Sequence, residues 1–146
     1  MKNDHFDQLK SHEGKHYTAS KSAAGRWLNY KLIHVEPGEI EASLVIRDEH
    51  TNPLKQLHGG MIALICDEIC GLCFYSLGFE TFYTTISLNI DFLLGVAKDS
   101  EITIKAKVIR SGKRISNVEC FLYDEQGMKL AHATTNLMNS GLKYLT

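Results

Sequence analysis

The sequence predicts an α+β fold in which a curved antiparallel β-sheet wraps around one long buried helix. Residues 59–75 are apolar on almost every side, and a helix without a polar face has to be buried all round. Four runs of alternating apolar and polar residues follow, with short linkers and no helical pattern between them. Strands joined in this way pair antiparallel. A strongly curved sheet covers much of such a helix, and a second copy of the chain can cover the rest.

The composition is that of an ordinary globular protein. The chain has 146 residues, 44% of them hydrophobic and 23% charged, which suffices for one domain with a sizeable core. We expect a single domain, with an N-terminal segment at 1–36 and a core at 37–146. The formal net charge of -1 provides no general attraction to nucleic acids or anionic membranes. No signal peptide is visible, nor an apolar run of the ~20 residues that span a bilayer, so we expect a cytoplasmic protein.

Residues 1–36 show only short-range patterns. We expect an amphipathic turn around Phe6 and Leu9 and a second short element over residues 23–32, with Trp27 and Tyr30 packing inward. A Pro-Gly pair at 37–38 then marks a turn. Beyond it, apolar residues recur at every second position, the pattern of a half-buried strand: Ile40, Ala42, Leu44 and Ile46.

The long helix begins after a polar loop that ends in His58-Gly59-Gly60. Its interior Gly71 lowers helix propensity by about 1 kcal/mol relative to alanine, so burial has to supply the stability. The apolar run also contains two adjacent carboxylates, Asp67 and Glu68. A buried carboxylate is costly unless it is paired or used in chemistry. Glu68 points about 100° away from Asp67 on a helix, and we interpret it as structural or interfacial.

Three of the four cysteines lie on this helix, at positions 66, 70 and 73. Their spacing also occurs among cysteines that hold an iron–sulfur cluster. Such ligands come from a loop, however, and these cysteines lie within an apolar helical run. Cysteine behaves as a small hydrophobic residue in protein cores. We therefore expect packing and no metal site, and no disulfide in a reducing cytosol.

Four strands are expected after the helix, which Gly78 ends. The alternation covers residues 85–92, 102–108, 118–123 and 128–138. A glycine-containing hairpin turn at 124–127 connects the last two strands. No internal repeat, low-complexity segment or second domain is visible.

The motif at the helix resembles the PaaI-like branch of the hotdog-fold acyl-CoA thioesterases. His58-Gly59-Gly60 is followed by Asp67 nine residues after the histidine and by Gly71 four residues further on. The resemblance extends over residues 37–138. It includes Asn52 six residues before the histidine, the strand Thr84–Phe92, the basic turn Ser111–Arg114, and Leu130-Ala131 in the last strand. It hardly includes residues 1–36.

This resemblance implies hydrolysis of an acyl-CoA thioester to a free acid and coenzyme A, without a cofactor. The chemistry agrees, because the N–H groups of Gly59 and Gly60 at the helix start can bind a carbonyl oxygen that becomes anionic. Asp67 is then the general base for water, or a carboxylate nucleophile. Asn52 could bind the carbonyl or the water, and Thr85 matches a position near the attacking water.

Each of these residues also has a structural interpretation. Asp67 could lie where the helix edge reaches solvent, and Thr85 could be an ordinary strand residue. His58 could act in the chemistry or simply cap the helix, and an Asn before Pro53 is a common turn pair. A basic cluster of five residues could meet the phosphates of coenzyme A or face solvent: Lys105, Lys107, Arg110, Lys113 and Arg114. Among these we assign substrate contact to Arg110, Lys113 and Arg114.

The helix also predicts how many chains form the active site. Asp67 lies seven residues beyond Gly60, which is about 10 Å along the helix axis. An aspartate side chain reaches only a few ångströms, so it cannot serve a carbonyl bound at the start of its own helix. A second, antiparallel helix related by two-fold symmetry solves this problem. We therefore expect a homodimer, and from the family resemblance a homotetramer.

Two other functions remain open at the level of sequence. A non-catalytic acyl-CoA-binding module would need no base, yet an acidic residue, Asp67, stands at the family's catalytic position. A hotdog dehydratase would use a histidine before the helix with a helix carboxylate, which His58 and Asp67 could supply. Residues 132–136, in the region that often lines the acyl tunnel of the family, match no pattern residue by residue. The acyl group is therefore not predicted.

Overall fold

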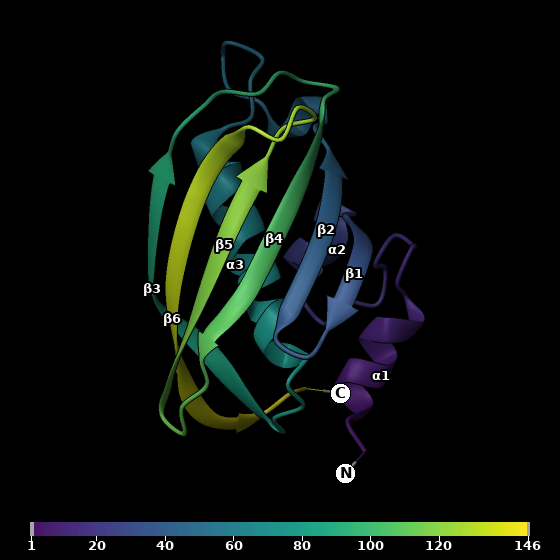
Figure 1. Cartoon of the computed structure of the whole chain (residues 1–146), viewed down its shortest axis with the longest axis vertical. Coiled ribbons are helices and arrows are strands. Elements are labelled where there is room, and N and C mark those ends of the chain that lie inside the picture. Colours follow the sequence, from purple (N-terminus) through teal and green to yellow (C-terminus); the bar gives the residue numbers. More distant parts are fainter. Residues whose placement is uncertain (1, 146) are drawn as a thin grey trace.

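The computed structural model describes residues 2–145 and contains one six-stranded antiparallel sheet in the order β1-β2-β4-β5-β6-β3 (Figure 1). The predicted α+β class is confirmed. The strands are β1 (Lys31–Glu36), β2 (Glu39–Val45), β3 (Thr81–Phe92), β4 (Glu101–Arg110), β5 (Ile115–Tyr123) and β6 (Lys129–Lys143). The helices are α1 (Asp4–Ser11), α2 (Ala23–Leu28) and α3 (Gly59–Tyr75), with a 3-10 turn η1 (Asp48–His50).

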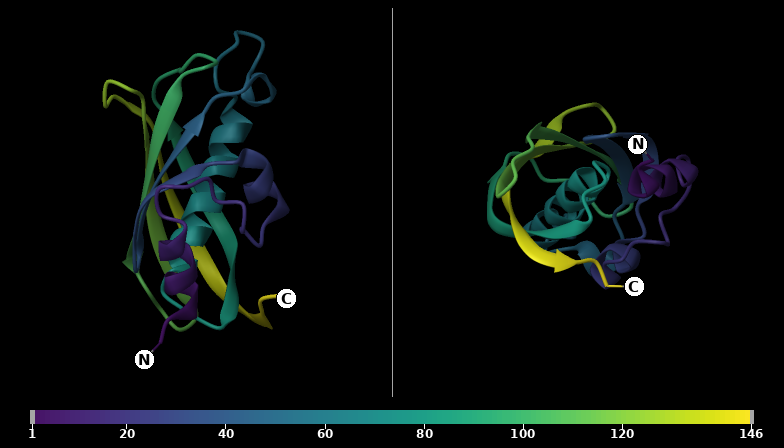
Figure 2. Two further views of the ribbon diagram at one scale, coloured as in Figure 1. Left: turned by 90° about the vertical axis from the view of Figure 1, so that its right-hand side faces the viewer. Right: turned by 90° about the horizontal axis from the view of Figure 1, so that it is seen from below.

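Helix α3 is the centre of the molecule. Figure 2 shows the sheet curling around it, which is the predicted hotdog arrangement. Eight of its side chains are buried: Ile62, Ile65, Cys66, Ile69, Cys70, Leu72, Cys73 and Phe74. The three helix cysteines and Cys120 on β5 are free thiols within this core. The cysteines of α3 therefore pack as small apolar side chains, as predicted.

The N-terminal segment differs from the prediction in two respects. Strand β1 was not predicted; it is followed by the turn at Pro37-Gly38 and pairs with β2 at the edge of the sheet. Trp27 was predicted to pack inward but is 43% exposed, whereas Tyr30 is 1% exposed as predicted. Arg47 explains the position of Trp27, because its guanidinium lies 5.1 Å from the ring centroid and binds the Trp27 carbonyl oxygen.

The other edge of the sheet is β3, and its alternation of apolar and polar residues does not bury every apolar side chain of the strand. Ile86 is 48% exposed and Phe92 is 59% exposed, although both belong to the apolar set of the strand. The outer side of β3 pairs with no strand among residues 2–145. An apolar edge strand of twelve residues is a surface that natural proteins usually cover.

In the described part of the chain, no helix is long and apolar enough to cross a membrane.

Candidate active site

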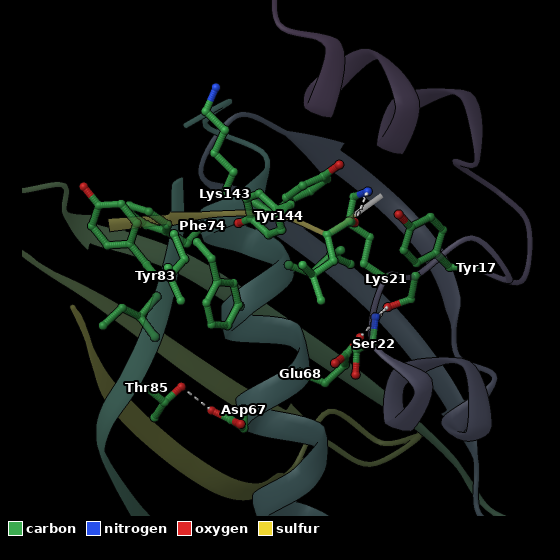
Figure 3. Close-up of a pocket in the computed structure, with 18 residues that line it drawn as sticks. Tyr17, Lys21, Ser22, Asp67, Glu68, Phe74, Tyr83, Thr85, Lys143 and Tyr144 are labelled. Carbon is green, nitrogen blue, oxygen red and sulfur yellow. Dashed lines mark hydrogen bonds between the residues drawn. The ribbon is translucent and has the colours of Figure 1, made fainter. Parts of the chain in front are cut away.

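Two of the predicted site residues meet between α3 and β3. The Thr85 hydroxyl donates a hydrogen bond to Asp67 Oδ1 over 2.6 Å (Figure 3). Asp67 is half-buried on the helix and Thr85 is exposed on the strand. Asp67 Oδ2 has no hydrogen-bond partner among residues 2–145. The structure therefore holds the carboxylate in one orientation and leaves one of its oxygens available.

A pocket of about 660 Å³ begins at this pair and runs along the C-terminal half of α3. Figure 3 shows Asp67 and Thr85 at one side and aromatic side chains at the other. Its interior is mostly apolar, with Leu72, Phe74, Tyr75, Phe82, Tyr83 and Leu137 among its walls. A carboxylate at the mouth of an apolar pocket of this size is a common form of ligand site.

The N-terminus of α3 is capped by the side chain of His58. Its Nδ1 accepts the N–H of Gly60 over 2.8 Å, and its carbonyl oxygen accepts the N–H groups of Met61 and Ile62. The N–H of Gly59 has no partner within residues 2–145. Of the two predicted carbonyl-binding amides, Gly59 is thus free and Gly60 is engaged. A β-carbon at Gly59 would lie 3.4 Å from the Phe92 ring, so the end of β3 lies beside this amide.

Asn52 shapes the loop that leads to the helix. Its Oδ1 accepts the backbone N–H groups of Leu54 over 2.9 Å and of Gln56 over 3.1 Å. The turn interpretation of Asn52 is therefore correct. A contact with substrate would have to come from Nδ2, which has no partner in the described part of the chain.

The structure does not bring the two halves of the predicted site together within one chain. Gly59, Gly60 and Asp67 lie on the same straight helix α3, so about 10 Å of helix axis separates the amides from the carboxylate. His58 and Asn52 belong to the amide end. Thr85 belongs to the carboxylate end.

The basic residues lie at the opposite end of the sheet from the start of α3 (Figure 1). Arg110, Lys113 and Arg114 are exposed around the β4–β5 turn. The Tyr83 hydroxyl donates to the carbonyl oxygens of Gly112 and Lys113, each over 3.2 Å, and so ties this turn to the pocket wall. The other two basic residues are engaged elsewhere, since Lys107 pairs with Glu39 and Lys105 lies over the Tyr123 ring.

Glu68 has the structural role that its helical direction predicted. Its Oε1 accepts hydrogen bonds from the Ser20 hydroxyl over 3.0 Å and the Tyr30 hydroxyl over 3.1 Å. Burial, and then the Glu68 carboxylate, raises the pKa of Tyr30, so this tyrosine stays protonated and donates. A β-carbon at Gly25 would lie 1.9 Å from Oε1, which explains the glycine there. Glu68 thus holds the N-terminal segment against α3.

Sequence reasoning missed the pocket walls that the two ends of the chain supply. Tyr17, Lys21 and Tyr144 all line the pocket. Neither end has a periodic pattern that links it to Asp67. The only signal in the sequence is an aromatic residue near each end, which a single chain cannot distinguish from ordinary packing.

The sequence matches the thioesterase superfamily over residues 54–131. The chain therefore belongs to this superfamily, and the resemblance inferred from its motif is confirmed. Human acyl-coenzyme A thioesterase 13 is 26% identical over 85 residues, which are 58% of this chain and 61% of that protein. The match thus spans about three fifths of the human relative.

Solved structures show the same fold. PaaI of Escherichia coli, from the phenylacetic acid degradation operon, superposes with a TM-score of 0.79 at 17% identity, covering 97% of this chain and 99% of that one. A hypothetical thioesterase of Streptococcus pneumoniae, solved with coenzyme A, superposes with a TM-score of 0.73 at 23% identity, covering 79% and 88%. At these identities the likeness concerns the fold.

Proposed function

We propose that this protein is an acyl-CoA thioesterase in which Asp67 activates the attacking water. The observation that carries the proposal is the Asp67–Thr85 hydrogen bond at the mouth of the apolar pocket, which leaves Asp67 Oδ2 available. Membership of the thioesterase superfamily and the coenzyme A bound to the streptococcal structure support the substrate class.

The proposed reaction needs only the thioester and water. Asp67 Oδ2 accepts a proton from water as the water oxygen bonds to the carbonyl carbon. The Gly59 N–H at the start of the helix stabilises the carbonyl oxygen as it becomes anionic. When the C–S bond breaks, the proton passes to the departing sulfur. In the nucleophilic alternative, Oδ2 attacks the carbonyl carbon itself, and water then hydrolyses the resulting anhydride.

We further propose that two chains form each site. One chain supplies Gly59, with Asn52 and His58 beside it, and its partner supplies Asp67 and Thr85. The length of α3 between these groups supports this arrangement, as does the exposed apolar edge at β3. When two chains pair with their α3 helices antiparallel, the N-terminus of one α3 lies near one end of the partner's sheet. The partner's basic turn between β4 and β5 lies at that same end. Arg110, Lys113 and Arg114 would then meet the phosphates of coenzyme A.

The His58 contact favours hydrolysis over the dehydratase alternative. A dehydratase would use this histidine as a base, but its Nδ1 already accepts the Gly60 N–H. The non-catalytic binding module is the remaining alternative, and the assay below separates it. A cytoplasmic location and the absence of a cofactor belong to the same proposal.

The test is release of free thiol from a panel of acyl-CoA thioesters by the purified protein. We expect turnover without an added metal or nucleotide, and no loss of activity with a chelator. Binding without turnover would favour the non-catalytic module, and hydration or dehydration without thiol release would favour the dehydratase. Activity lost to a chelator and restored by a divalent cation would contradict the proposed chemistry.

A further inference from the structure

Gly71 lies on the face of α3 that the sheet leaves open. It follows Asp67 by four residues, so the two share one face of the helix one turn apart. Both line the pocket. A β-carbon added at Gly71 would meet no atom within 4 Å. Gly25 is the opposite case, since a β-carbon there would collide with Glu68. Within residues 2–145, no other part of the chain packs against Gly71. The missing side chain therefore leaves open space beside the Asp67 carboxylate.

Tyr144 closes another side of the same pocket. Figure 3 shows it across the pocket from Asp67. Its ring packs edge-on against Tyr75 and Phe82, with centroid distances of 5.1 Å and 5.6 Å. Burial raises the pKa of Tyr144 to about 12, so its hydroxyl stays protonated at neutral pH. Its neighbour Leu145 accepts a hydrogen bond from Lys21 Nζ through its carbonyl oxygen, over 3.5 Å.

We propose that the pocket receives the acyl group and that Gly71 and Tyr144 are specificity-determining residues. Gly71 admits the acyl chain beside Asp67, and Tyr144 limits how far it extends. This inference rests on the proposed thioesterase function and adds the acyl class. The walls beside Gly71 and Tyr144 are apolar and include Leu72, Tyr75 and Phe82, while Lys21 and Lys143 also belong to the lining. Bulky apolar acyl groups are therefore the substrates.

The experiment measures kcat/KM for a series of saturated acyl-CoAs of increasing length. Gly71→Leu fills the space beside Asp67, so activity on the longest acyl groups should fall by at least about tenfold while the shortest is retained, on the scale of methylene discrimination by apolar pockets. Leucine also has a higher helix propensity than glycine, so the variant should fold. Tyr144→Ala should shift the optimum towards longer acyl groups.

Tyr123→Ala is the matched control for Tyr144→Ala, because it removes a tyrosine from a strand outside the pocket. Its acyl profile should equal that of the wild type. Gly71 could instead be a glycine because a partner helix packs closely against it. Light scattering distinguishes this role from substrate specificity, because it measures whether Gly71→Leu changes the oligomeric state. If Gly71→Leu dissociates the protein and loses all substrates equally, the specificity role is wrong. An unchanged profile in both pocket variants would also overturn it.

Failure of the proposed function gives a different result. A wild type that hydrolyses no thioester would refute the enzyme, but acyl-CoA affinities measured by calorimetry would still test the pocket. Gly71→Leu should then weaken binding of the longest acyl-CoA by at least about tenfold relative to the shortest. Equal weakening for both would overturn the inference.

Discussion

Asp67 has two oxygens in different surroundings, and this difference is the basis of the first prediction. Thr85 donates a hydrogen bond to Oδ1, while Oδ2 accepts none from residues 2–145, and the residue lines the pocket. Asp67→Asn keeps the size of the side chain and an oxygen that can accept from Thr85, but it removes the basic oxygen. We expect kcat to fall at least about a hundredfold, the low end for loss of a general base. Thermal unfolding should show an intact fold, and unaltered hydrolysis would refute the assignment.

Thr85 should matter less than Asp67, because it orients the carboxylate without taking the proton. Thr85→Val removes the hydroxyl and keeps the branched shape that suits a strand. A hydrogen bond to a charged group contributes about 1.5–3 kcal/mol, so we expect kcat to fall about tenfold or more, with a smaller effect than Asp67→Asn. Thr103→Val, on β4 outside the pocket, is the control for loss of a strand hydroxyl. A larger loss in Thr85→Val than in Asp67→Asn would contradict this order of roles.

The places of residues could be predicted where the residues belong to a regular element. The resemblance placed Asp67 on the helix and Thr85 on the next strand near the attacking water, and a hydrogen bond joins the two side chains. The roles of His58 and Asn52 depend on side-chain orientation in an irregular loop. The sequence allowed His58 either to cap the helix or to act in the chemistry, and Asn52 either to form a turn or to bind substrate. No periodic pattern determines how such loop side chains are oriented, and in the structure His58 caps the helix and Asn52 forms turn hydrogen bonds.

At the level of elements, the 3-10 turn η1 makes the stability of the fold depend on pH, because it contains the buried and titratable His50. Its Nδ1 accepts the Arg47 N–H, and its carbonyl oxygen holds the His58 N–H. Burial, and then the positive charge of Arg47, lowers the pKa of His50. Because the folded state disfavours the proton, this histidine stabilises the fold above its unfolded pKa of about 6.5, and that stability is lost as the pH falls towards the folded pKa.

We therefore expect the melting temperature to fall on acidification from pH 7 to pH 5, and His50→Asn to reduce this fall. Asparagine offers an oxygen near the position of Nδ1 but does not titrate. Part of the slope should remain, because burial also lowers the pKa of His5. His16→Asn, at the protein surface, controls for histidine content. An equal pH slope in the wild type and in His50→Asn would contradict this account.

The strands that could be predicted are those with clear alternation. β2 and the four strands after α3 were identified in this way, whereas β1 was not. Its burial follows no period of two, because only Leu32 and Val35 are buried and a bulge lies between Leu32 and His34. Trp27 was placed wrongly for a related reason. A short helix of six residues does not determine which side faces the core, and the distant Arg47 decides it.

For the whole molecule, the all-apolar helix was enough to predict the architecture. A helix that needs cover on every side allows few solutions for a chain whose other long elements are antiparallel strands. The ends of the chain could not be placed by the same argument. Their contacts with α3 join residues far apart in the sequence, such as the hydrogen bonds of Ser20 and Tyr30 with Glu68 and the packing of Tyr144 on Tyr75. No local pattern encodes such contacts.

The assembly is the last consequence of this architecture. β3 leaves an apolar edge with Phe82, Ile86 and Phe92 at 44%, 48% and 59% exposure. A two-fold pairing at this edge would cover it and bring the start of one α3 towards Asp67 of the other. We therefore expect at least a dimer in solution, with two equivalent sites.

Mixed dimers test the shared site directly. Asp67→Asn removes the base, and Gly59→Val obstructs the amide end, where a β-carbon already meets the Phe92 ring at 3.4 Å. Each variant alone should be nearly inactive. If the two halves of a site come from different chains, a mixed dimer has one site with both defects and one intact site. Random mixing makes about half of the dimers mixed, so about a quarter of wild-type activity should return. A site contained within one chain would be defective in both subunits of a mixed dimer, so a verified mixture without rescue, or a fully active monomer, would exclude the shared site.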